Sequence, residues 1–152
     1  MYPIDMQFVC ALQVELGPVT EMGEGRGATR RIVPIIGGKF EGPLLKGKVL
    51  SVGADWQSVY TDGLAFLDTR YALQTDDGAV IEIINQGFRH GPQGVLARLV
   101  AGEDVDSSLY YMRTCARLET GDPRYDWVNR HIFVGRGKRL ANAVKVELFQ
   151  LL

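Results

Sequence analysis

Hydrophobic and polar residues alternate with a period of two along most of this chain. In the first such run, the even positions from Phe8 to Leu16 are apolar, whereas Gln13 and Glu15 occupy odd positions. Successive side chains of a strand point to opposite faces, so this pattern predicts a half-buried β-strand over 8–16. Comparable runs predict further strands over 29–36, 44–52, 55–61, 64–75, 79–87, 110–119, 130–136 and 141–151.

Glycine-containing turn signals separate these runs. Asp76-Asp77-Gly78 predicts a hairpin, because Asp-Gly tolerates the positive φ of tight turns. The segment 135–139 predicts a second hairpin turn, with an anion site as the alternative. Two short helices are expected, one over 94–102 and one that begins at Asp122-Pro123. Regularly spaced short strands with turns between them are typical of a sandwich or a barrel.

The ends of the chain bear on which of these two folds forms. Both the first and the last run are strong strand patterns, so they can pair and remove the open edges of the sheet. No strand–helix–strand alternation is present, which disfavours a parallel α/β sheet. The sequence therefore predicts one all-β domain over 1–152, a closed antiparallel barrel of about eight to ten strands with one or two short helices.

Composition narrows the class of partner. The chain has 17 basic and 18 acidic residues and a net charge of −1, which argues against nucleic acid and against a membrane surface. The N-terminus has no basic start followed by an apolar stretch, so we expect no signal peptide and a cytoplasmic location. Cys10 and Cys115 are expected as buried free thiols. His90 and His131 have no metal-ligand spacing, so no metal site is expected.

Polar residues embedded in the strand runs are the candidates for chemistry. In the run 110–119, the odd positions include Tyr111, Arg113 and Glu119. If that face points inward, an arginine in the lumen can hold a carboxylate in fork geometry, and a carboxylate there has a raised pKa. If it points outward, the same charges form a solvated ladder across the strands. The lumen-facing orientation is the working expectation.

Several other residues are candidates for a ligand site at the barrel mouth. Asp55 and Gln57 flank Trp56 shortly after Gly53, and a carboxylate beside an indole suits such a mouth. The alternative is a turn in which the tryptophan folds back on the core. Trp127 with Asn129 completes this set, whereas Arg70 belongs with the polar residues embedded in strands, within the run 64–75.

Seven ordered motifs carry a resemblance to a known family: 36–43, 53–57, 62–63, 67–71, 110–114, 118–122 and 127–130. Together they resemble the bacterial and fungal domain-of-unknown-function family 3237 over about 8–151. The resemblance implies a calycin-like barrel that often self-associates, as a homodimer or higher homo-oligomer. It also implies small cofactor-independent enzymes of aromatic catabolism, among them decarboxylases of lignin-derived compounds. One departure is Ser51-Val52-Gly53, where a Pro-Gly-Gly turn is expected.

The function expected from residues and resemblance together is a cofactor-independent lyase (decarboxylase) or isomerase. Its ligand is a small aromatic or phenolic acid in the lumen, and an eight-stranded barrel can hold one such molecule. The residues assigned to it are Glu119 or Asp55 as acid or base, Arg113 and Arg70 as anion holders, Tyr111, Asn129 and Gln57 as orienting groups, and Trp56 and Trp127 as aromatic walls. The alternatives are a lipocalin-like carrier of an apolar or aromatic ligand, and a barrel filled by its own core.

Overall fold

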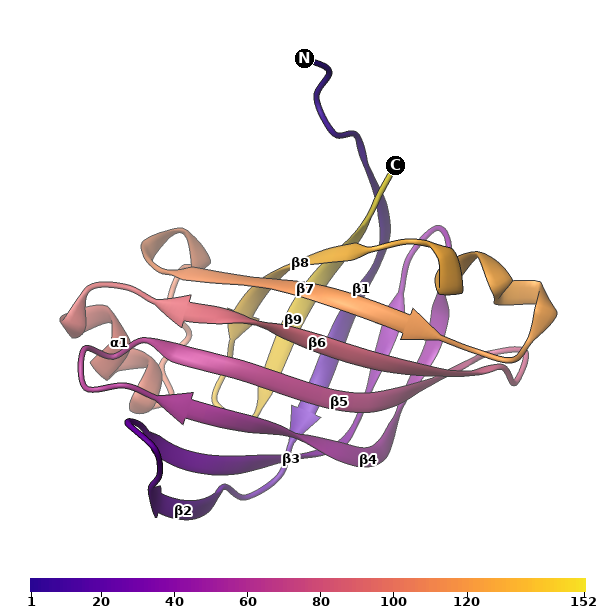
Figure 1. Cartoon of the computed structure of the whole chain (residues 1–152). Coiled ribbons are helices and arrows are strands. Elements are labelled where there is room, and N and C mark those ends of the chain that lie inside the picture. Colours follow the sequence, from indigo (N-terminus) through magenta and orange to yellow (C-terminus); the bar gives the residue numbers. More distant parts are fainter.

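Nine antiparallel strands dominate the computed structural model, which describes residues 1–152 (Figure 1). They are β1 (Met6–Leu16), β2 (Thr20–Glu24), β3 (Thr29–Glu41), β4 (Lys46–Val59), β5 (Ala65–Thr75), β6 (Val80–His90), β7 (Tyr111–Glu119), β8 (Phe133–Arg139) and β9 (Ala143–Leu151). One α-helix, α1 (Gln93–Val100), and two 3₁₀ helices, η1 (Ser107–Leu109) and η2 (Pro123–Arg130), connect strands.

The strands form a closed barrel with one strand added outside it. The sheet order is β1-β9-β8-β7-β6-β5-β4-β3-β2, and β1 also pairs with β3, which closes eight strands. The two ends of the chain pair as expected, from Met6 opposite Leu151 onward. β2 extends the sheet by pairing with the first residues of β3. Closure leaves β2 as the exposed edge, and the predicted closed antiparallel barrel is confirmed.

Local differences from the predicted elements arise at glycines. The hairpin at Asp76-Asp77-Gly78 is confirmed, with Gly78 at φ 94°. The predicted strands 44–52 and 55–61 are one strand, β4, in which Gly53 has φ 95° and the ladder to β5 shifts register. A Cβ at Gly53 would overlap the carbonyl oxygen of Arg70, so this glycine permits the bend. The turn predicted over 135–139 is wrong, because β8 runs through these residues.

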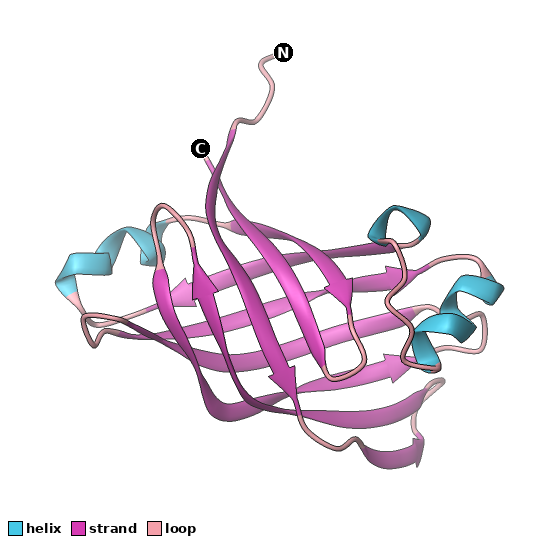
Figure 2. Cartoon of the chain, turned by 180° about the vertical axis from the view of Figure 1, so that it is seen from behind, coloured by secondary structure: helices cyan, strands magenta, loops and turns pink.

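Apolar packing fills most of the barrel and both of its ends carry helices (Figure 2). The main core is a cluster of 18 buried residues that includes Phe133 and Leu148 from the strands and Val128 from η2. A second cluster of six residues joins Leu99 of α1 to Tyr110 and Met112. No helix of the chain has the length and apolar character that crossing a bilayer demands.

Candidate functional site

The inward faces of three strands change from apolar to polar along the barrel. On β6 the buried positions are Ile81, Ile83, Asn85, Gly87 and Arg89 in turn. The inward positions of β8 likewise run from Phe133 to Arg139, and those of β4 include Asp55 and Gln57. Because the strands are antiparallel, the C-terminal halves of β4, β6 and β8 lie at the same end of the barrel. The lumen is therefore lined by polar side chains at that end of the barrel, and this region is called the polar patch below.

Asp55 is the carboxylate of this patch. It is 7% exposed, and its Oδ2 accepts a hydrogen bond of 2.6 Å from Nε2 of Gln57. Its Oδ1 accepts a bond of 2.9 Å from the backbone N–H of Asp68. Nε of Arg31 donates in turn to Oε1 of Gln57 over 2.8 Å. Burial raises the pKa of Asp55 above its usual range, and the bonds from Gln57 and Asp68 and the charge of Arg89 only partly offset this.

Three guanidinium groups face this single carboxylate. Arg89 is 8% exposed, and its Nε has no hydrogen-bond partner. Burial, with the charges of Arg139 and Arg31, lowers the pKa of Arg89 to about 10, although Asp55 acts in the opposite direction. Burial, followed by the charge of Arg31, also lowers the pKa of Arg139. The salt bridges of the structure join other residues, so none of these three cations has a carboxylate within salt-bridge distance.

A cavity of about 40 Å³ lies among these groups. Eight of its sixteen lining residues are hydrophobic, with Tyr71 among them, and its polar groups are the Tyr71 hydroxyl and the side chains of Asp55, Gln57, Thr69, Asn85, Arg89, Thr114 and Arg139. Burial, followed by the charges of Cys10 and Asp55, raises the pKa of Tyr71, so its phenol is a neutral hydroxyl at pH 7. Oδ1 of Asn85 and Oγ1 of Thr114 are buried without hydrogen-bond partners. The cavity therefore presents an acid, a cation and free polar atoms together.

The structure reverses the orientation expected for β7. Met112, Ala116 and Leu118, at its even positions, are buried in the apolar clusters. Tyr111, Arg113 and Glu119 therefore point outward and are exposed.

Cys115 lies on that same outward face, whereas Cys10 is buried as expected. The core contacts of the apolar face determine this orientation, so the predicted lumen position of the three polar residues is wrong.

Two further predicted residues also lie on the outside. Trp56 alternates with its inward neighbours on β4 and is 45% exposed. Arg70 points away from the lumen, and its Nη2 lies 2.7 Å from Oε2 of Glu82 on β6. Both residues therefore stand on the outer face of the barrel, away from Asp55.

The predicted pair on η2 belongs to the other end of the barrel. Oδ1 of Asn129 accepts a bond of 2.9 Å from the backbone N–H of Thr120, and its Nδ2 donates 3.0 Å to the carbonyl of the same residue. Trp127 packs against Phe133 with ring centroids 6.1 Å apart. In the structure these contacts hold η2 on the core.

Of the nine predicted residues, the structure brings Asp55 and Gln57 together in the lumen.

The sequence prediction missed Arg31, Asn85, Arg89 and Arg139. A signal for them exists, because the period of two that places Ile81 and Ile83 inward continues to Asn85 and Arg89. The same extension leads from Phe133 to Arg139, and backward along β3 from buried Val33 to Arg31. The pattern that was missed is a charged residue at the same alternate positions as the buried apolar residues of its strand.

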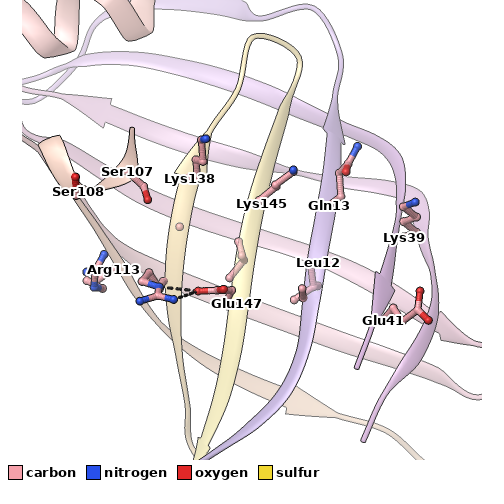
Figure 3. Close-up of a pocket in the computed structure, with 14 residues that line it drawn as sticks. Leu12, Gln13, Lys39, Glu41, Ser107, Ser108, Arg113, Lys138, Lys145 and Glu147 are labelled. Carbon is pink, nitrogen blue, oxygen red and sulfur yellow. Dashed lines mark hydrogen bonds and ion pairs between the residues drawn. The ribbon is translucent and has the colours of Figure 1, made fainter. Parts of the chain in front are cut away.

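A larger pocket, of about 660 Å³, lies on the outer surface over β1, β8 and β9 (Figure 3). Lys138, Lys145 and Lys39 project from these strands and from β3, with Arg113 at the far side. Lys138 already pairs with Asp104 at 2.7 Å, and Arg136 pairs with Glu147. Lys39, Lys145 and Arg113 are in no ion pair, but interactions between exposed charges are weak in water, so the buried lumen is the stronger candidate site.

Comparison with known proteins places the chain in a family. The model of the family described as "Protein of unknown function (DUF3237)" matches residues 4–151. A UPF0311 protein from Rhodopseudomonas palustris is 42% identical over 149 residues, which cover 98% of this chain and 97% of the relative.

Solved structures share the same barrel. A conserved protein of unknown function from Rhodopseudomonas palustris has a TM-score of 0.96 at 39% identity, with 100% of both chains covered. A β-barrel-like protein from Acinetobacter baumannii has a TM-score of 0.88 at 44% identity, over 100% of this chain and 98% of that one. An enzyme from Penicillium herquei shares the fold, with a TM-score of 0.75 at 18% identity over 100% and 97% of the chains. The chain therefore belongs to the DUF3237 family, which is described as a family of proteins of unknown function.

Proposed function

We propose that this protein is a cofactor-independent lyase of the decarboxylase kind, or an isomerase, that acts on a small aromatic or phenolic acid in the lumen. The observation that carries the proposal is Asp55, a buried carboxyl group with a raised pKa at a cavity. A group that transfers protons works best when its pKa approaches the working pH. Carboxyl groups with raised pKa values in clefts are for this reason candidates for acid–base catalysis.

The hydrogen bonds around Asp55 suit that role. Each of its oxygens accepts one bond from the protein, one from Gln57 and one from the backbone of Asp68. A carboxylate oxygen has two lone pairs, so each keeps one for a proton or for the substrate. Arg31 donates to the amide oxygen of Gln57, so the amide nitrogen of Gln57 is turned toward Asp55. Asp55 is thereby held in one position and can still exchange a proton.

The same cavity supports the charge changes of either reaction. In a decarboxylation, the bond between the carboxyl carbon and the adjacent carbon breaks, CO₂ leaves, and the electron pair remains on that carbon. Protonated Asp55 then supplies the proton that fills this position. In an isomerisation, ionised Asp55 removes a proton and returns it at another atom. Where the reacting carbon is conjugated to a phenol or carbonyl oxygen, the negative charge is delocalised onto that oxygen, and the neutral Tyr71 hydroxyl donates a hydrogen bond to it in either path.

The alternative of a carrier for an apolar ligand has less support. Eight of the sixteen residues that line the cavity are hydrophobic, which suits an apolar molecule. Such a molecule would nevertheless leave Nε of Arg89 buried without a polar partner, at a cost in free energy. A ligand with polar groups is therefore favoured.

A panel of hydroxylated benzoates and cinnamates tests the proposal, with CO₂ release and chromatography of the products as readouts. Asp55→Asn should reduce turnover at least about 100-fold, the usual contribution of a proton-transfer group. Glu82→Gln, which neutralises an exposed carboxylate on the outer face, is the matched control and should leave turnover unchanged. Turnover that survives in Asp55→Asn would refute the assignment.

A further inference from the structure

We propose that Arg89, with Arg139 beside it, is a receptor for a carboxylate group, so that the substrate enters the barrel carboxylate first. This inference rests on the proposed function and names the chemical group by which the lumen recognises its substrate. It assigns recognition to residues on β6 and β8 that the sequence prediction did not select.

The charges of the lumen favour an anion. Arg89 and Arg139 line the cavity with one carboxylate, Asp55, and Arg31 faces them through Gln57. Arginine is almost never fully buried unless it is paired, because removing the cation from water costs several kcal/mol. A second negative charge would balance this excess of positive charge.

Hydrogen bonding singles out Arg89 among the three cations. Nε of Arg31 donates to Gln57, and Nε of Arg139 donates to the carbonyl oxygen of Leu140 over 2.8 Å. Nε of Arg89 has no partner, although more than nine-tenths of the residue is buried. A guanidinium group offers two parallel N–H bonds that match the two oxygens of a carboxylate. Arg89 is the one of the three whose Nε is free for a side-on fork formed with one Nη.

The size of the cavity determines which part of the substrate reaches Arg89. The volume of about 40 Å³ holds about three spheres the size of a water molecule, at about 10–15 Å³ each. A carboxylate has three heavy atoms, whereas a cavity that holds benzene has about 150 Å³. The carboxylate therefore fits beside Arg89, whereas the ring exceeds this volume and lies outside it.

Isothermal titration calorimetry with benzoate and with neutral benzamide, two probes of nearly equal shape, tests this receptor. Wild-type protein should bind benzoate at least about tenfold more tightly than benzamide. Arg89→Gln should weaken benzoate about 10- to 100-fold, the range expected for hydrogen bonds to a charged group, and leave benzamide unchanged. Arg136→Gln removes a guanidinium from the outer face of β8 and is the matched control, with benzoate affinity unchanged. Circular dichroism melting of each variant verifies the fold.

The outcomes separate this inference from the proposed function. Equal affinity of wild-type protein for benzoate and benzamide overturns the receptor, even if Asp55→Asn still abolishes turnover. Equal benzoate affinity in Arg89→Gln and Arg136→Gln does the same. Selective binding that depends on Arg89, without turnover of any acid, supports the receptor and refutes the enzyme. If Arg89→Gln does not fold, Arg139→Gln replaces it in the test. Its preference for benzoate over benzamide must then be lower than that of the wild type, and an unchanged preference overturns the receptor.

Discussion

The pH dependence of stability in Asp55→Asn probes the environment of the lumen directly. Asp55 is buried, and burial raises its pKa in the folded protein above the ordinary value of 3.8. Asparagine has nearly the same shape and does not titrate. The two proteins share every other ionisable group, so the difference between their unfolding free energies isolates the titration of Asp55.

The sign follows from proton binding. Between pH 3.8 and the pKa of folded Asp55, the folded protein holds more protons than the unfolded chain. The unfolding free energy of the wild type therefore falls, relative to the variant, as the pH rises through this window. The slope reaches up to about 1.4 kcal/mol per pH unit and returns to zero above the pKa of folded Asp55.

A second effect of the substitution is independent of pH. Asparagine at this position would turn an N–H₂ group or an oxygen toward Nε2 of Gln57, and the former leaves two donors opposed. An unsatisfied buried donor costs about 1–3 kcal/mol. This cost shifts the unfolding free energy of the variant by the same amount at every pH. The slope of the difference against pH is unchanged, so the slope is the quantity that reports on the titration of Asp55.

Urea denaturation at half-unit steps from pH 4 to pH 8, followed by circular dichroism, measures both proteins. The variant should gain stability relative to the wild type as the pH rises from 4. Glu82→Gln, which alters an exposed carboxylate, provides the comparison for a surface group. A difference between Asp55→Asn and wild type that is constant with pH, or that decreases, would show that burial does not control this carboxyl group.

Three other outcomes test the packing and the outer face. Phe133→Ala, at a fully buried side chain of the main core, should lower the unfolding free energy by about 3–5 kcal/mol in urea titrations. Arg70→Ala should change it by less than about 1 kcal/mol, because the ion pair with Glu82 is largely exposed; a larger loss would indicate a structural role. With an aromatic disulfide reagent, Cys115 should react in the folded protein. Cys10 should react only on unfolding, because burial raises its pKa to about 12; rapid release of two thiols would contradict this.

Local sequence pattern accounts for much of the fold. The apolar residues at even positions from Cys10 to Leu16 lie on the inner side of β1 as predicted, whereas Phe8, before a shift in register, is exposed. Asp76-Asp77-Gly78 marks the hairpin between β5 and β6. Gly53 was interpreted as a turn, but it bends a continuous strand, because only the neighbouring strand shows whether pairing continues past a glycine. The same limit applies to the segment 135–139, which is part of β8.

The candidate site was harder to predict from local pattern. Along β7, polar residues at the odd positions drew attention, yet the apolar face with Met112, Ala116 and Leu118 determines which way the strand points. Burial of the apolar face decides which side of β7 points inward, because each buried aliphatic side chain contributes about 1.5–3 kcal/mol. The stronger signal was the apolar one.

The sequence by itself determined most of the strands, several of their turns and the ability of the two ends to pair, but it missed β2 and the continuity of β4. An alternating pattern defines two faces for each strand, but it does not connect one strand to another. Only closure of the barrel brings Asp55 of β4, Arg89 of β6 and Arg139 of β8 to one end of a shared lumen. These residues are far apart in the chain, and the register of several strand pairs must be correct before they meet. The tertiary structure therefore decided that the barrel contains a buried acid among excess cations.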